Sequence, residues 1–164
     1  MKGWLVDTDV IADLCSATPN RKVRKWIEGQ PESRLFLSVL TLGEYWRSIE
    51  RMEFGDARRP VLERAVDALG RRFEGRVLSL TDGVVLRWGA KSGAATQITG
   101  GSPLVLVGLQ AELAMENGLY LATGFGAQVK GMGAQVFDPW KDDPAGFGVG
   151  RGVSCRLSVF SCQC

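Results

Sequence analysis

The chain has 164 residues, of which 45% are hydrophobic and 23% are charged, proportions that fit one folded domain and leave little room for a second. Its formal net charge of +2 is too small to drive nucleic-acid binding by itself. The sequence contains no histidine, which excludes imidazole-based catalytic triads and histidine-ligated zinc sites. Any chemistry must therefore depend on carboxylates or hydroxyls.

No run approaches the ~18 uninterrupted apolar residues of a membrane span. The first residues reach Asp7 before a signal-peptide core could form, which predicts a cytoplasmic protein without a membrane partner. The spacing of the four cysteines resembles neither a zinc motif nor a disulfide scaffold.

Apolar runs alternate with amphipathic stretches along most of the chain. The patterns predict strands over 3–7, 35–40, 77–80, 119–123 and 134–137. Between them they predict a short helix over 9–14, helices capped by Asn20 and by Thr41, an amphipathic helix over 58–73, a helix from Asp82 and a helix over 109–115. A glycine-rich loop is expected over 98–102. This alternation predicts an α/β fold in which helices flank a central parallel sheet. The domain is expected to cover residues 1–140, and the glycine-rich residues 141–164 are expected to form an irregular, partly disordered tail.

Three polar positions follow predicted strands. Asp7 ends the first strand, Glu44 lies shortly after the second, and Thr123 ends the fourth. Because ligands of parallel sheets bind beyond the carboxyl ends of the strands, these side chains are expected to converge. Two carboxylates suit a magnesium ion, which would activate water for phosphodiester cleavage. The alternatives are a turn or cap role for Asp7 and a Thr-x-x-Glu capping box joining Thr41 to Glu44.

The segment Leu5-Val6-Asp7-Thr8-Asp9-Val10-Ile11 resembles the opening of PIN-domain ribonuclease toxins of the VapC type. Further similar blocks follow in the family's order, so that the resemblance spans roughly residues 3–140. These blocks lie at 19–26, 37–44, 71–78, 82–89, 117–123 and 136–140.

The resemblance implies a Rossmann-like PIN fold and hydrolysis of RNA with Mg²⁺ or Mn²⁺. It also implies a cognate antitoxin as partner in a toxin–antitoxin system, and a homodimer. Asp7 and Glu44 match the family's first and second acids, which are its catalytic metal ligands. Thr123 matches a hydroxyl residue near the metal.

The acidic site is nevertheless degenerate. The family's third acid falls on Val107 or Gly108, and its Thr-Arg-Asn cluster is replaced by Thr123-Gly124-Phe125. Either the chain is an inactive PIN-like protein that binds an antitoxin or RNA without cleaving it, or another acid compensates. Glu112, one helical turn after Gly108, is the best substitute, with a solvated surface acid as its alternative reading. Asp9 is either an accessory group or an exposed turn acid.

Two surface features bear on partners. The helix carrying Trp46, Ile49 and Met52 is a candidate antitoxin or dimer contact. Basic residues near both acid-bearing segments form either a rim that captures phosphates or ordinary helix faces. They are Arg21, Lys22, Arg24, Lys25, Arg47, Arg51, Arg58 and Arg59.

Overall fold

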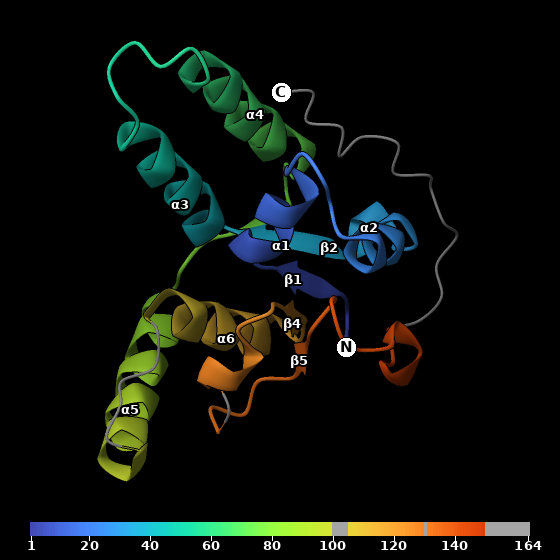
Figure 1. Cartoon of the computed structure of the whole chain (residues 1–164). Helices are drawn as coiled ribbons and strands as arrows, with labels where there is room; N and C mark the ends of the chain where they lie inside the picture. Colours follow the sequence, from blue (N-terminus) through green and yellow to red (C-terminus); the bar gives the residue numbers. More distant parts are fainter. Residues whose placement is uncertain (100–104, 130, 150–164) are drawn as a thin grey trace.

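Five parallel strands form the centre of the fold in the computed structural model, which describes residues 1–99, 105–129 and 131–149. Figure 1 shows this sheet between the helices. The strand order is β3-β2-β1-β4-β5, so the chain adds β2 and β3 on one side of β1 and then crosses from β3 to the other side, where it adds β4 and β5. The predicted central parallel sheet is confirmed, although each strand is shorter than its apolar run. The strands are β1 (Trp4–Val6), β2 (Leu35–Ser38), β3 (Val77–Leu78), β4 (Tyr120–Ala122) and β5 (Val136–Phe137).

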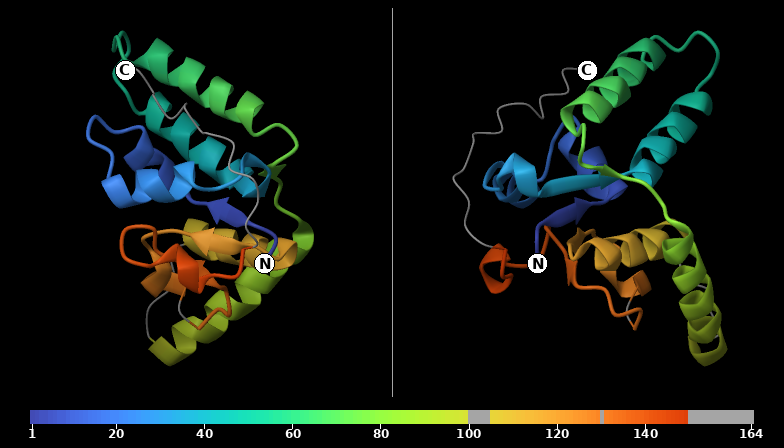
Figure 2. Two further views of the ribbon diagram at one scale, coloured as in Figure 1. Left: turned by 90° about the vertical axis from the view of Figure 1, so that its right-hand side faces the viewer. Right: turned by 180° about the vertical axis from the view of Figure 1, so that it is seen from behind.

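Helices cover both faces of this sheet. On one side lie α1 and α2, with the α3–α4 hairpin extending outward, and on the other lie α5 and α6 (Figures 1 and 2). The α-helices are α1 (Thr8–Leu14), α2 (Arg21–Glu28), α3 (Val39–Glu50), α4 (Arg59–Arg72), α5 (Asp82–Thr99) and α6 (Val105–Asn117). Short 3-10 turns are η1 (Glu32–Arg34), η2 (Gly126–Val129) and η3 (Pro144–Gly146). Within these described ranges, no helix has both the length and the apolar character needed to cross a bilayer.

The observed helix ends match some of the predicted ends and differ from others. Asn20 caps α2 as expected, and Gly118 ends α6 with a φ of 65°, a conformation that glycine adopts without strain. The predicted cap of α3 is wrong: Ser38 caps this helix, because its hydroxyl accepts from the Thr41 N–H at 3.1 Å. The helix α5 also runs to Thr99, into the predicted 98–102 loop, of which 100–102 lie outside the described residues.

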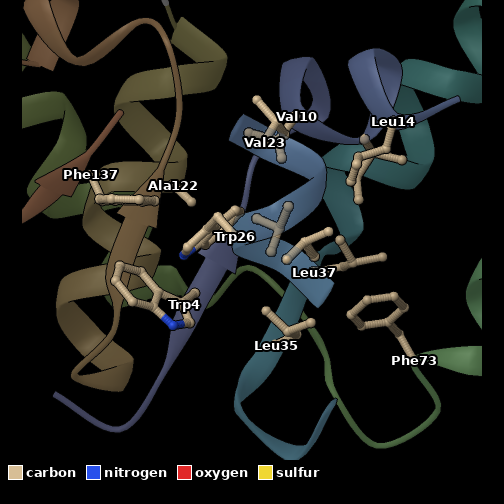
Figure 3. Close-up of a cluster of buried hydrophobic side chains, with 13 residues drawn as sticks. Trp4, Val10, Leu14, Val23, Trp26, Leu35, Leu37, Phe73, Ala122 and Phe137 are labelled. Carbon is tan, nitrogen blue, oxygen red and sulfur yellow. The ribbon is translucent and has the colours of Figure 1, made fainter. Parts of the chain in front are cut away.

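Alternation along the strands builds two cores. In β1, Trp4 and Val6 pack in the core that contains residues of α1 and α2, whereas Leu5 packs in the core that contains residues of α5 and α6. Figure 3 shows the first core, with Trp4 beside Trp26 of α2. The first core contains an aromatic cluster in which the Trp4 ring lies 4.8 Å from that of Phe137. Phe147 joins it at 4.9 Å from Phe137, so packing continues beyond the predicted domain end at residue 140. The division into a domain over residues 1–140 and a tail over 141–164 stays a prediction. Residues 150–164 of that tail lie outside the described ranges.

Candidate active site

Asp7 occupies the point where β1 turns into α1. Its backbone N–H still belongs to the sheet, donating to Ala122 O at 3.0 Å, while its side chain caps α1 by accepting from the Thr8 N–H at 2.6 Å. The residue is only 4% exposed. Burial raises the pKa of the Asp7 carboxyl, against the lowering effect of hydrogen bonds from Thr123, Thr8 and Gln110. A nearby cation would relieve this burial penalty.

Glu44 reaches the same place from α3. The Thr8 hydroxyl donates to Glu44 Oε2, so Thr8 contacts Glu44 through its side chain and Asp7 through its backbone. Because Ser38 rather than Thr41 caps α3, the capping-box alternative for Glu44 is excluded. Burial raises the pKa of Glu44; the Thr8 hydrogen bond opposes this rise and the charge of Asp7 adds to it. The two predicted acids therefore lie close enough to repel each other.

Asp9 and Thr123 complete the cluster. Asp9 lies in the first turn of α1, and its carboxylate accepts from the backbone N–H groups of Val10 and Gly124 at 2.7 Å each. The Thr123 hydroxyl, fully buried, lies 3.4 Å from Asp9 Oδ2. Burial and the charge of Asp7 raise the pKa of Asp9 to about 6. Asp9 is thus a half-buried member of the cluster, and its alternative reading as an exposed turn acid is wrong.

Gln110 is a member of the cluster that the sequence interpretation missed. This α6 residue is fully buried, and its Nε2 donates to Asp7 Oδ1. The Ser38 hydroxyl donates to Gln110 Oε1 at 3.4 Å and also holds the first turn of α3, the helix that carries Glu44. A neutral amide therefore ties together the elements that carry both acids. A polar residue inside the apolar run of α6 was the available signal.

The structure also locates the two candidates for the missing third acid. Val107 lines the pocket beside Asp7, whereas Gly108 faces Trp88: a Cβ at Gly108 would lie 2.8 Å from Trp88 Nε1. The position that faces the cluster is therefore Val107, which offers no metal ligand.

Glu112 does not take over this role. Although it is only 1% exposed, it faces α5, where its carboxylate pairs with Lys91 at 2.8 Å and Arg87 at 3.5 Å. This placement corrects both readings of Glu112, as a substitute ligand and as a solvated surface acid. The cause is the α5–α6 contact, which turns this side of α6 away from Asp7.

The cluster opens into a pocket of about 520 Å³, lined by Asp7, Thr8, Asp9, Ala12, Glu44, Val105, Leu106, Val107 and Phe125. Within the described part of the chain, no group of three or more acids, cysteines or histidines is arranged to hold a metal. Magnesium needs less than this, because one or two carboxylates with several waters suffice. The charge of Asp7 raises the pKa of both Asp9 and Glu44, and this repulsion between carboxylates in one pocket fits a divalent cation.

The predicted basic rim is only partly free to bind phosphate. Arg24 pairs with Glu28, Arg58 with Asp56, and Arg59 with Glu50 and Glu63. Arg47 lies close enough to Glu44 for its charge to lower the pKa of that carboxyl.

The fold and this cluster agree with comparison to known proteins. The PIN-domain family model matches residues 4–95, more than half of the chain. The chain therefore belongs to the PIN-domain family, as its sequence blocks predicted.

Two curated relatives are similar over almost their whole length. VapC ribonuclease Y4jK of Sinorhizobium fredii is 31% identical over 144 residues, covering 84% of this chain and 97% of the relative. Plasmid stability protein StbB of Pseudomonas syringae pv. tomato is 29% identical over 137 residues, covering 84% and 98%. The crystal structure of FitAcB from Neisseria gonorrhoeae matches with a TM-score of 0.75 at 24% identity, over 85% of this chain and 99% of that one, which supports the fold.

Proposed function

We propose that this protein is the toxin of a toxin–antitoxin pair and a divalent-metal-dependent endoribonuclease acting in the cytoplasm. One observation carries the proposal: Asp7 between β1 and α1, Asp9 in α1 and Glu44 in α3 line one pocket beyond the carboxyl end of β1. Membership of a family whose relatives include a VapC ribonuclease supports RNA as the substrate.

The chain's own residues divide the work. Asp7 and Glu44 would hold Mg²⁺ or Mn²⁺, with Thr8 fixing the spacing of their carboxylates through its N–H and hydroxyl. Asp9, held by Gly124 and Thr123, is available to accept a proton from an attacking water, since burial gives its carboxyl a pKa of about 6. When bound, the cation supplies Lewis-acid stabilisation of the phosphate. Gln110 keeps Asp7 in place without adding a fourth negative charge to the cluster.

Cleavage of a structured RNA with and without Mg²⁺ or Mn²⁺ tests the proposal. We expect cleavage that requires the metal and falls by roughly three orders of magnitude in Asp7→Asn. The matched control is Asp67→Asn, an exposed acid in α4, which should cleave normally. Metal-dependent cleavage that survives Asp7→Asn would refute the assignment of this site.

A second function remains in competition because Val107 stands where the family's third acid is expected. With fewer carboxylates, metal binding and water orientation weaken. In this alternative, the protein binds an antitoxin or RNA without cutting it. The distinguishing result is tight RNA or antitoxin binding with no cleavage at any metal concentration.

An antitoxin and a second copy of the chain are the protein partners that we propose. Of the predicted contact residues in α3, Trp46 is 40% exposed but Ile49 is buried at 1%, so Ile49 is not part of a free surface. Val39 of α3 is 43% exposed, and Val85 and Leu86 of α5 are 42% and 73% exposed. Apolar side chains gathered on a helix are typical of protein interfaces. Trp46→Ser should weaken binding of the antitoxin about tenfold or more, whereas Phe54→Ser, on the α3–α4 loop, should not. Sedimentation of the purified chain tests the homodimer.

A further inference from the structure

Phe125 is an aromatic side chain at the edge of the acid cluster that the proposed chemistry leaves unexplained. It lines the same pocket as Asp7, Asp9 and Glu44, yet it is 48% exposed. A single exposed apolar side chain needs no explanation. Phe125 is not single, because Val105 of the same pocket is 50% exposed. The pocket therefore combines carboxylates with solvent-exposed apolar walls.

The backbone around Phe125 is held against the cluster. Its N–H donates to the Thr123 hydroxyl at 3.0 Å, and the N–H of the preceding Gly124 donates to Asp9 at 2.7 Å. Two backbone hydrogen bonds thus hold the segment that carries the Phe125 ring against Thr123 and Asp9 of the acid cluster.

The two neighbours of Phe125 are glycines for a packing reason. A Cβ on Gly124 would lie 3.2 Å from both Asp9 Oδ2 and the Trp140 ring, and a Cβ on Gly126 would lie 2.8 Å from Val136 Cγ1. The loop therefore lies close against the protein body on both sides of Phe125. The phenylalanine ring is the side chain that this loop presents to the pocket.

We infer that Phe125 is the surface on which an unpaired base of a single-stranded RNA stacks beside the acid cluster, an inference that rests on the proposed function. A nucleotide carries a flat apolar ring next to an anionic phosphate, which matches an apolar wall next to cation-binding carboxylates. Bases inside a double helix are already stacked on each other, so only unpaired nucleotides offer a free face. An apolar peptide segment would cover Phe125 and Val105. It would offer the pocket's carboxylates no positive charge, and no phosphate to share a bound cation with them.

The test measures binding apart from cleavage. The probe is a fluorescein-labelled ten-nucleotide RNA of mixed sequence, single-stranded or annealed to its complement, in Ca²⁺, with its integrity checked on a gel after each titration. Phe125→Leu keeps an apolar side chain but removes the ring. Phe54→Leu is the matched control, since Phe54 is fully exposed on the α3–α4 loop. Thermal melts confirm that each variant is folded.

Phe125→Leu should bind the single strand about five- to a hundredfold more weakly than the wild type, as loss of one base stack predicts. The duplex should be bound equally by both, and Phe54→Leu should match the wild type on either probe. Equal affinity of Phe125→Leu and wild type for the single strand overturns the inference, and so does an equal loss on the duplex. A variant that keeps RNA binding but loses the antitoxin would assign the ring to a protein interface instead.

Failure here and failure of the proposed function give different results. If Phe125→Leu binds single strands normally while cleavage still depends on Asp7, the stacking inference fails and the nuclease stands. If no RNA is cleaved but single-strand binding depends on Phe125, the stacking surface stands and the nuclease fails.

Discussion

Replacement of Gln110 by leucine tests whether a buried amide stabilises the ionised form of Asp7. The side chain loses a hydrogen bond to a charged group, worth about 1.5–3 kcal/mol, and a long one from the neutral Ser38 hydroxyl, worth about 0.5–1 kcal/mol. Burial of leucine in place of an amide offsets roughly 1 kcal/mol of this. We therefore expect Gln110→Leu to lower the free energy of unfolding by about 1–3 kcal/mol at neutral pH, measured by urea denaturation.

The loss should depend on pH, and its direction follows from the charge of Asp7. Burial raises the pKa of Asp7 in the folded protein, and the hydrogen bond from Gln110 opposes that rise. Without Gln110, the folded-state pKa of Asp7 rises further, so ionised Asp7 costs the variant more than the wild type. The destabilisation is therefore full at pH values above this raised pKa, and it shrinks as the pH falls and Asp7 takes up a proton in both proteins.

A double-mutant cycle with Asp7→Asn separates this effect from packing. In the Asp7→Asn background the carboxylate is absent, so Gln110→Leu should cost at least about 1 kcal/mol less than in the wild type. The same loss in both backgrounds, or a loss that does not change with pH, would refute the reasoning and leave Gln110 as a packing residue.

Three further predictions concern Asp9, Glu112 and Val107. Because the pKa of Asp9 is raised from 3.8 to about 6 in the folded protein, the free energy of unfolding falls as the pH rises through this window. Asp9→Asn should remove that fall and raise the free energy of unfolding by about 1–3 kcal/mol at pH 7. Equal melting temperatures of variant and wild type at pH 7 would contradict this. Glu112→Gln should lower the free energy of unfolding, measured in urea, by about 1–3 kcal/mol. This is less than the loss expected for a fully buried ion pair, because Lys91 and Arg87 are partly exposed. A drop in the metal affinity measured by calorimetry would contradict the placement of Glu112 outside the site. Val107→Asp should bind Mn²⁺ about ten- to a hundredfold more tightly in the same titration, and an unchanged affinity would show that this position does not reach the ion.

Hydrophobic periodicity predicted most of the fold because the alternation of strands and the amphipathic pattern of helices can both be seen within a short stretch of sequence. Strand residues alternate between the two cores, and the amphipathic pattern of 58–73 corresponds to α4. The start of α3 was misplaced because Ser38 and Thr41 lie three residues apart and both suit a cap. Tertiary contact decides between them, since Ser38 also donates to Gln110.

The candidate site was predictable only in part. Asp7 carries a signal because it lies just beyond a strand, Glu44 lies in the helix that follows the next strand, and the family pattern marks both. Gln110 carries only the weak signal of a polar residue in an apolar run, and the sequence does not show which way Glu112 faces, because their partners are distant in the chain: Asp7 lies 103 residues from Gln110, and Lys91 belongs to another helix. Which side of α6 faces the pocket is set by packing on α5.

The contact between Gly108 and Trp88 limits how this protein could change. Any side chain added at residue 108 meets the indole ring, so mutation at that codon disturbs the α5–α6 contact. Residue 107 lines the pocket that holds the acids, and one nucleotide substitution converts a valine codon into an aspartate or a glutamate codon. If the lineage lost a carboxylate, a direct path back through residue 107 is still open.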